Sequence, residues 1–181
     1  MKNLKQYFLF SILVFISFSF GLADNWVLIK KSDYQILFPL EPKEESENME
    51  SAIGNLNMTY LTYSATESET EKNLVYMIMH TDYPDSVVHS DFKTQLKTLF
   101  DGAIEGAVNN VKGKLIHQKD IEINGYPGRE FSIDYNDGEA VMFIKTYLVK
   151  NRMYMLQTIT NTGKYPNDDI TKFMQSFKLM N

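Results

Sequence analysis

The chain has 181 residues, with 18 lysines and arginines, 23 aspartates and glutamates, and no cysteine. Without cysteine, the protein has no disulfide framework, no thiol nucleophile and no cysteine-based metal site. Its net charge of −5 argues against nucleic acid or anionic lipid as a partner, because both bind cationic surfaces.

The first 23 residues are arranged as a secretory signal peptide. Lys2 and Lys5 form a short basic region, residues 7–20 are mostly apolar, and residues 21–23 (Gly-Leu-Ala) supply small side chains at a cleavage position. The apolar run is shorter than the roughly 20 residues of a membrane-spanning helix. We therefore expect cleavage before Asp24 and a periplasmic or secreted protein. It is not a lipoprotein, since no cysteine follows the cleavage position.

Residues 24–181 have the length of one ordinary domain. Signal cleavage removes two lysines and no acidic residue, so the net charge changes from −5 to −7. No apolar segment after the cleavage position is long enough to span a bilayer. We expect a single exported domain without a transmembrane span.

The first part of this domain is predicted to be extended. Residues 26–38 form two short extended pieces that Pro39 ends. Residues 41–51 are acidic and polar, as in a solvated edge strand or loop, with a cation-binding patch as the alternative. Residues 56–65 and 74–83 combine aromatic and β-branched side chains, as strands do. The second of these has apolar residues on both faces, which is typical of a central strand.

A long amphipathic helix is predicted next. Apolar side chains recur at three- and four-residue spacing from Val88 to Val111, which is the helical period. Asp85 or Ser86 would cap its start, and Asn110 or Gly113 would end it in a left-handed conformation.

Two glycines interrupt this helix, Gly102 and Gly106. Each costs about 1 kcal/mol relative to alanine in a helix. Because they are four residues apart, they lie on one side of the helix, and we expect that side to approach a sheet closely.

The second half predicts a series of hairpins. Strands are expected at residues 114–123, 129–135, 139–150 and 152–160, joined by the turns NGYPG, NDG and Asn151-Arg152.

A short terminal helix follows, capped by Asn167 or Asp168. Four apolar residues share one face of it: Ile170, Phe173, Met174 and Phe177. These elements together predict an α+β fold, in which a long helix and a C-terminal helix pack on an antiparallel sheet.

Histidines offer one candidate metal site. His80 and Asp82 are two residues apart at a strand end, with Asp85 nearby, and such a set could hold a metal ion. His89 lies near the helix start, and His117 lies in a strand without a neighbouring base or nucleophile. Neither predicts a site.

No catalytic motif is present. The sequence lacks the HExxH, G-x-S-x-G, P-loop and Rossmann patterns. Its paired acids, Glu44/Glu45 and Asp168/Asp169, fall in polar turns or caps, where nothing raises a carboxyl pKa for general acid catalysis. We therefore expect a protein that is not an enzyme and binds no cofactor.

The ten methionines allow two interpretations. Met77 and Met79, and likewise Met153 and Met155, are spaced so that each pair lies on one side of a strand. Thioethers suit Cu(I), but methionine also fills irregular cores, which the apolar surroundings favour. A methionine- and aromatic-lined cavity under the long helix would suit an apolar ligand.

The stretch INGYPGREFSIDY holds most of the candidate site residues. Asn124 and Gly125 permit the positive φ of a tight turn, Pro127 fixes the chain direction, and Gly128 allows a second unusual backbone angle. The stretch reads as a structural corner that could also serve a partner.

Arginine is rare beside lysine, with two residues against sixteen. Arg129 therefore indicates a need for a planar guanidinium, which could clamp carbonyls or a carboxylate across the sheet, near the KNRMY turn that holds Arg152. The candidate partner-binding or structural residues are Gly125, Pro127, Gly128, Arg129 and Arg152.

Four stretches occur in an order that resembles PsbP-like proteins, which share a fold with the Ran-binding Mog proteins. They are W…Y.ILFPLEPK, I.INGYPGREFSIDY, YLVKNRMYMLQ and FMQSFKL. The resemblance implies an α/β/α sandwich with a central antiparallel sheet of about six or seven strands. It implies an exported or lumenal assembly or docking factor, or an uncharacterised bacterial protein, and it brings no catalytic residues.

Three functions follow from these observations. The first is a non-enzymatic exported domain that binds a protein partner or assists assembly at the cell envelope. The second is a carrier that holds an apolar ligand between helix and sheet. The third is a hydrolase or metal-dependent enzyme centred on His80 and Asp82.

Overall fold

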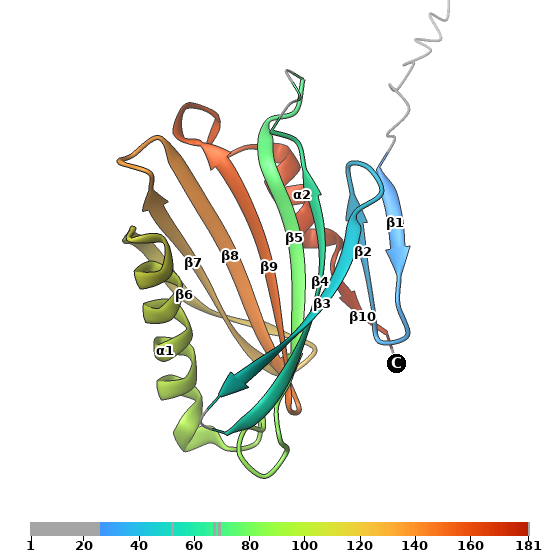
Figure 1. Ribbon diagram of the computed structural model, residues 1–181, viewed down its shortest axis with the longest axis vertical. Coiled ribbons are helices and arrows are strands. Elements are labelled where there is room, and N and C mark those ends of the chain that lie inside the picture. The colour runs from blue at the N-terminus through green and yellow to red at the C-terminus, as the bar shows by residue number, and fades with distance from the viewer. Residues whose placement is uncertain (1–25, 52, 67, 69, 181) are drawn as a thin grey trace, which may run out of the picture.

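A seven-stranded antiparallel sheet forms the centre of the molecule (Figure 1). The computed structural model describes residues 26–51, 53–66, 68 and 70–180, so the predicted signal peptide lies outside the described residues. The strand order in this sheet is β3-β4-β5-β9-β8-β7-β6. The bounds are β3 Lys43–Ser51, β4 Gly54–Ser64, β5 Asn73–Asp82, β6 Lys114–Ile123, β7 Tyr126–Tyr135, β8 Ala140–Val149 and β9 Arg152–Asn161.

The hairpins form where positive φ angles allow tight turns. Asn124 and Gly125 join β6 to β7 with φ of 50° and 82°, and Asn136 and Asp137 lie between β7 and β8 with φ of 56° and 54°. Lys150 makes the same conformation before β9, with φ of 55°. Such turns match the twist of antiparallel strands. The predicted α+β fold with a sheet of about six or seven strands is confirmed.

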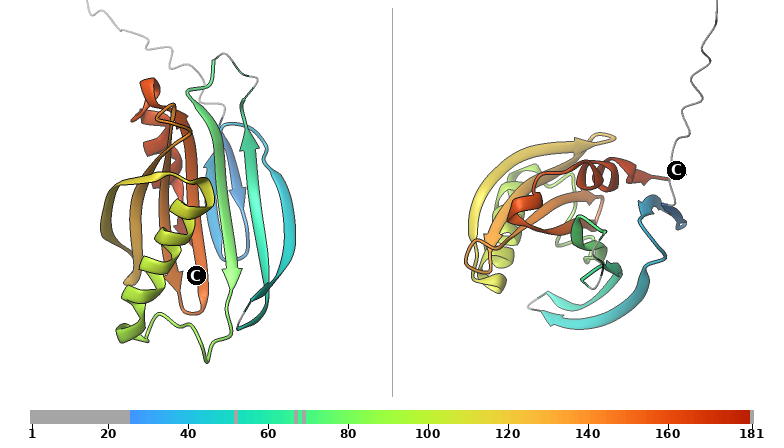
Figure 2. Two further views of the ribbon diagram at one scale, coloured as in Figure 1. Left: turned by 60° about the vertical axis from the view of Figure 1, so that its left-hand side comes forward. Right: turned by 90° about the horizontal axis from the view of Figure 1, so that it is seen from above.

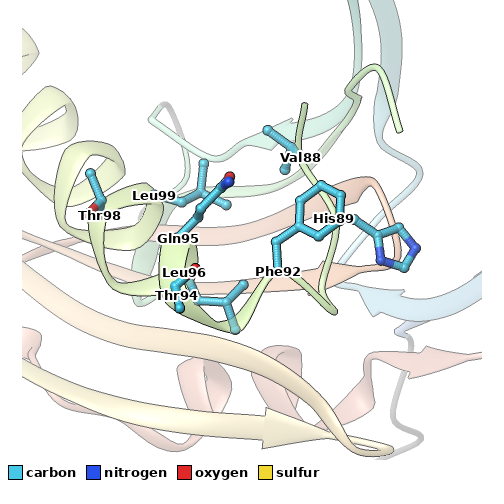
Figure 3. A pocket seen from close by; sticks show the side chains of 8 residues that line it. All are labelled: Val88, His89, Phe92, Thr94, Gln95, Leu96, Thr98 and Leu99. Carbon is cyan, nitrogen blue, oxygen red and sulfur yellow. The ribbon is translucent and has the colours of Figure 1, made fainter. Parts of the chain in front are cut away.

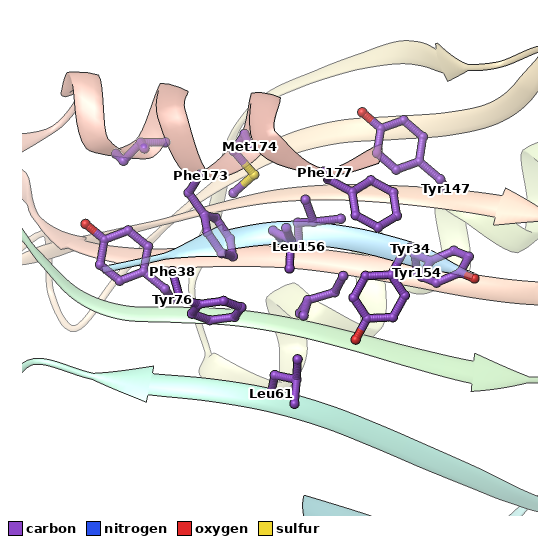
Figure 4. Close-up of a cluster of buried hydrophobic side chains, with 13 residues drawn as sticks. Tyr34, Phe38, Leu61, Tyr76, Tyr147, Tyr154, Leu156, Phe173, Met174 and Phe177 are labelled. Atoms are coloured by element: carbon purple, nitrogen blue, oxygen red, sulfur yellow. The ribbon is translucent and has the colours of Figure 1, made fainter. Parts of the chain in front are cut away.

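A second, smaller sheet was not predicted. It consists of β1 (Val27–Lys30), β2 (Tyr34–Phe38) and β10 (Lys178–Leu179), in the order β1-β2-β10. Together with α2 (Asp168–Ser176), it covers one face of the large sheet (Figure 2). The interface is an aromatic core in which Tyr76 meets Phe173 edge-on at 5.4 Å and Tyr34 meets Tyr154 at 5.7 Å (Figure 4).

The C-terminal helix forms as predicted. Asn167 caps it, since its side chain accepts hydrogen bonds from the backbone N–H groups of Asp169 and Ile170. The four predicted apolar residues are all buried: Ile170, Phe173, Met174 and Phe177. Phe177 follows the last helical residue.

The long helix α1 (Lys93–Val111) covers part of the opposite face, over β6, β7 and β8 (Figures 1 and 2). Ile104 packs there among Phe131, Ile133 and Ile144, while Phe100 packs against Leu148 and Met153. Two layers therefore sandwich the sheet.

The predicted start and end of α1 were wrong. The helix begins at Lys93 instead of after Asp85 or Ser86, and its left-handed C-cap is Lys112, with φ of 51°, instead of Asn110 or Gly113. The preceding loop cannot be helical because it is tied to the β8–β9 turn, where the N–H of buried Ser90 donates to the carbonyl of Lys150 at 2.8 Å.

The expected close approach of the helix glycines was also wrong. Gly102 and Gly106 are exposed, and a Cβ added to either would meet nothing within 4 Å. They lie on the solvent side of α1, so their absent side chains serve no packing purpose.

The acidic segment forms the edge strand β3, and most of its side chains are exposed, in agreement with the predicted solvated edge strand. Across the parts of the chain that the structure describes, no helix is long and apolar enough to cross a membrane.

Candidate functional site

A polar cleft of about 570 Å³ opens at one end of the large sheet, the lower end in Figure 1. At this end β5 and β8 finish and β7 and β9 start, beside the β1–β2 turn and β10. The lining residues come from five segments of the chain: Asp33; Asp82; Asn124 and Tyr126; Val149, Lys150, Asn151, Arg152 and Tyr154; and Leu179 and Met180.

Arg152 organises the cleft by binding two carboxylates at once. Its Nε donates to Oδ1 of Asp82 at 2.5 Å and a terminal nitrogen donates to Oδ2 at 2.6 Å, so the pair is bidentate. The other terminal nitrogen donates to Asp33. Because Asp33 lies in the β1–β2 turn of the small sheet and Asp82 ends β5 of the large one, the guanidinium joins the two sheets.

The protonation states of this cluster favour the ion pairs. Hydrogen bonds from Arg152 lower the pKa of Asp82. Burial would raise the pKa of Asp33, but hydrogen bonds from Tyr154 and Arg152 outweigh burial and lower it. Burial and the bond to Asp33 raise the pKa of Tyr154, so its hydroxyl stays protonated and donates.

The mouth of the cleft remains open to solvent and carries polar groups. Lys150 and Asn124 are exposed, Tyr126 is half-buried, and the Asp82 side chain is 51% exposed. Cations, a carboxylate and an amide thus lie around one opening, a set that suits a polar segment of another protein through hydrogen bonds and ion pairs.

Of the predicted site residues, Arg152 lies in the cleft and Arg129 does not. The expectation that Arg129 lies near the KNRMY turn was wrong, because its side chain points to the other face of the sheet, towards α1. There its Nε lies 2.9 Å from Oδ1 of Asp120 and a terminal nitrogen lies 3.8 Å from Asp101. The Nε–H is not aligned with an acceptor, so the Asp120 contact is an ion pair without a good hydrogen bond.

Arg129 does clamp a carboxylate across the sheet, as predicted. Asp120 is its direct partner in the β6–β7 register. The guanidinium also lies 5.8 Å from the centre of the Phe100 ring, within cation–π range. The side chain is 15% exposed, so Arg129 holds α1 on the sheet.

The other candidates of this stretch have structural roles. Gly125 has the expected positive φ. Gly128 does not have an unusual backbone angle as predicted: it is required because a Cβ would lie 2.4 Å from the carbonyl oxygen of Thr146. Pro127 belongs to β7 and not to the turn, at a position where β8 does not yet pair with that strand. Proline has no N–H to donate, and at this position β8 is not paired with β7, so the lack of an N–H is tolerated.

His80 and Asp82 do not converge on a metal. Both oxygens of Asp82 bind Arg152, while His80 lies beside the rings of Tyr34 and Tyr154. Burial and the charge of Arg152 lower the pKa of His80. Among the described residues, no three His, Asp or Glu side chains could hold a metal ion.

A second pocket of about 400 Å³ lies between α1 and the loop before it (Figure 3). Its lining is largely apolar, with Val88, Phe92, Leu96 and Leu99 facing one another and His89 at the side. This pocket opens at the surface. Beneath α1, the space against the sheet is filled by the side chains of Phe100, Ile104 and their neighbours.

Sequence reasoning missed Asp33, Tyr154, Asn124 and Lys150. The rarity of arginine singled out Arg152, but Asp33 lies 119 positions away from it. Only the β5–β9 pairing and the docking of the small sheet bring these residues together. The turn predicted at Asn151-Arg152 lies directly after Lys150, but its pattern did not single out Lys150 as a site residue.

Neither a protein-family model nor a curated protein matches the chain. Among solved structures, the solution structure of cyanobacterial PsbP (CyanoP) from Synechocystis sp. PCC 6803 matches with a TM-score of 0.53 and 11% sequence identity, covering 90% of this chain and 96% of that one. A protein of unknown function, PA94 from Pseudomonas aeruginosa, matches with a TM-score of 0.36 and 9% identity over 81% and 90% of the two chains. The first likeness shows that this chain has a PsbP-like fold.

Proposed function

We propose that the protein is an exported, non-enzymatic binding or assembly domain that takes a polar segment of a protein partner in the cleft around Arg152. The observation that carries the proposal is that one guanidinium holds two aspartates from different sheets at the wall of an open cleft of about 570 Å³. A pre-arranged polar site of this kind loses little side-chain entropy when it binds.

The chemistry of the cleft supports binding over catalysis. Arg152 occupies both oxygens of Asp82, and Tyr154 and Arg152 hold Asp33. Neither carboxylate is thus available as a base in this arrangement. The PsbP-like fold and the signal-like residues 1–23 agree with a docking protein of the periplasm or of the secreted fraction.

A photo-crosslinking experiment at the cleft tests this function. Benzoyl-phenylalanine placed at Tyr126, inside the cleft, should capture a protein from the cell envelope. The same residue at Tyr135, at the other end of β7, is the matched control and should not capture it.

A charge reversal distinguishes the cleft from non-specific adhesion. Lys150→Asp should abolish the product formed from position 126, because aspartate tolerates the positive φ at this position while reversing the charge at the mouth. Lys114→Asp, an exposed lysine at the opposite end of the sheet, should leave the product unchanged. Equal capture from positions 126 and 135 would count against the proposal.

The second candidate, a carrier of an apolar ligand, rests on the apolar pocket at the start of α1. Its volume of about 400 Å³ is within the range of small-ligand sites. Native mass spectrometry of the purified protein tests this function: an added mass that disappears on denaturation supports it, and a bare protein mass argues against it.

A further inference from the structure

On the face of the large sheet where α1 packs, the part over β4, β5 and β9 carries a cluster of methionines. Met77 and Met79 lie on β5, Met153 and Met155 on β9, and Met58 on β4. In the strand register Met79 is directly opposite Met155, and Met153 and Met58 both pair with Thr81 from opposite sides. Direct partners and alternate residues share a face, so all five side chains project to the side of α1.

The register places these side chains within reach of one another. Directly opposed residues of an antiparallel pair have Cβ atoms about 5 Å apart and diagonal neighbours about 7–8 Å apart. Met79 and Met155 are a direct pair, and Met77 is diagonal to Met155. Because methionine is unbranched with three rotatable bonds, three thioether sulfurs from these positions can turn towards one point.

Core packing, which the sequence favours for these methionines, holds fully for Met153 and in part for Met155. Met153 is buried beside Phe100 and Leu148, and Met155 packs partly against the core under α1. Met58, Met77 and Met79 are only partly buried and lie outside the three buried clusters. Three flexible thioethers at a water-accessible sheet face are therefore not explained by filling the interior.

The side chains directly opposite Met77, Met79 and Met155 carry no charge. His80 alternates with Met79 and Thr81 along β5, so its ring lies on the opposite face, beside Tyr34 and Tyr154. Gln157 and Tyr60 oppose Met77 and Met79, and Thr146 opposes Met155. The acidic side chains of this face, Glu45 and Glu47, lie further out on the edge strand β3. A group of thioethers whose direct partners are uncharged selects a soft monovalent cation, Cu(I) or its analogue Ag(I), over zinc or magnesium.

We propose that Met77, Met79 and Met155 form a Cu(I) site on this face of the sheet, with Met58 and Met153 beside it. The site lies away from the Arg152 cleft, because Asp82 directly follows Thr81 and Arg152 directly precedes Met153 in their strands, and both therefore project to the opposite face. It is independent of the proposed partner binding.

An anaerobic titration of the purified protein with Cu(I), kept reduced by ascorbate and in competition with the chelator bicinchoninate, tests the proposal. We expect one Cu(I) per chain, and X-ray absorption should show sulfur neighbours alone. Thioethers carry no proton at these pH values, so the affinity should be the same at pH 7 and pH 5, whereas binding through histidine would weaken on acidification.

Leucine substitutions locate the site. The triple variant Met77→Leu/Met79→Leu/Met155→Leu should lose at least about 100-fold in Cu(I) affinity, because leucine keeps the volume but has no donor. The control Met174→Leu removes a methionine of α2, which packs in the core on the other side of the sheet, and should bind like the unmodified protein. Circular dichroism verifies that both variants fold.

A measurement on the unmodified protein keeps the test independent of folding of the variants. With ¹³C-labelled methionine methyl groups, addition of Ag(I) should shift the signals of Met77, Met79 and Met155 and leave that of Met174, on the other side of the sheet, in place. Complete loss of Cu(I) to the chelator, nitrogen or oxygen neighbours in the absorption spectrum, or equal shifts of all methionines would overturn the proposal.

Discussion

Each of the two arginines connects segments that are distant in the chain, and each does so with its planar guanidinium. Arg152 joins the β1–β2 turn to the end of β5 through Asp33 and Asp82, and Arg129 joins β7 to β6 and α1 through Asp120 and Asp101. A lysine would provide a point charge without the two parallel hydrogen bonds that Asp82 receives. The rarity of arginine in the sequence was therefore a sound indication of structural importance, although it did not identify the partners.

Replacing Arg152 by alanine should destabilise the protein by about 1–3 kcal/mol at pH 7, because two carboxylates lose a shared charged partner. The effect should depend on pH. The folded state lowers the pKa of both Asp33 and Asp82, so their contribution to stability is present above the ordinary aspartate pKa and is lost as pH falls through the lowered values. Below about pH 4 the variant and the unmodified protein should therefore converge.

Urea unfolding between pH 7 and pH 3 measures this convergence. Lys114→Ala, which removes an exposed positive charge at the other end of the sheet, is the control and should give a small difference that does not depend on pH in this range. A constant difference for Arg152→Ala would mean that the arginine acts through packing and not through the two carboxylates.

Gly128 and Gly125 are expected to respond differently to alanine. At Gly128 a Cβ would meet the Thr146 carbonyl oxygen at 2.4 Å and the Tyr147 ring at 2.6 Å, so Gly128→Ala should cost about 3 kcal/mol. At Gly125 a Cβ would meet nothing within 4 Å. Gly125→Ala should therefore cost only about 1–2 kcal/mol, which comes from the positive φ of 82°. Thermal unfolding of both variants gives the ranking, and the reverse order would contradict the close-approach explanation.

At the scale of elements, the solvent side of α1 is not optimised for stability. Gly102 and Gly106 lie there in open space, and glycine is the least stable of the ordinary residues within a helix. Nothing in the described structure requires either glycine.

Gly106→Ala should therefore stabilise the protein by about 0.5–1 kcal/mol, through the lower entropy of the unfolded chain. Gly102→Ala should act in the same direction. Gly113→Ala is the contrasting variant, since its Cβ would lie 2.5 Å from Ile133 and 2.7 Å from the Asp134 carbonyl. Calorimetry should show a higher melting temperature for the first two and a lower one for the third.

Elements with local signals could be predicted from the sequence, and those fixed by distant contacts could not. The β6–β7–β8–β9 order follows from short turns at Asn124, Asn136 and Asn151, whose signals lie within a few residues. The start of α1 depends on the hydrogen bond between Ser90 and Lys150, which are 60 positions apart. The apolar spacing at residues 88–92 predicted a helix there, but this bond holds the segment as a loop. Local period alone does not reveal such a competing contact.

For the molecule as a whole, both pockets lie at the same end of the sheet. The loop that bounds the apolar pocket is bonded to Lys150 and Asn151, which line the polar cleft. The sequence showed the residues of each segment, but β5 pairs with β9 across about 70 residues, and no local pattern encodes such a pairing. The candidate site could therefore be predicted only as far as Arg152 and its turn.

The last strand of the chain completes the cleft, and its removal is the test at this scale. Leu179 pairs with Tyr34, the N–H of Met180 donates to the carbonyl of Asp33 at 2.8 Å, and both side chains line the cleft. A chain that ends at Lys178 should lose about 1–3 kcal/mol of stability, because it lacks the half-buried Leu179 and the hydrogen bond from Met180 to Asp33.

Hydrogen exchange should locate this loss in the small sheet. The amides of β1 and β2 should exchange faster in the shortened chain, while those of β8 and β9 keep their protection because the large sheet does not include β10. The position of Asp33 also loosens, so crosslinking from position 126 should weaken. A chain that ends at Met180 is the control, since it keeps both contacts. Unchanged exchange in β1 and β2 would show that the small sheet holds Asp33 without β10, and the cleft would then depend on Arg152 alone.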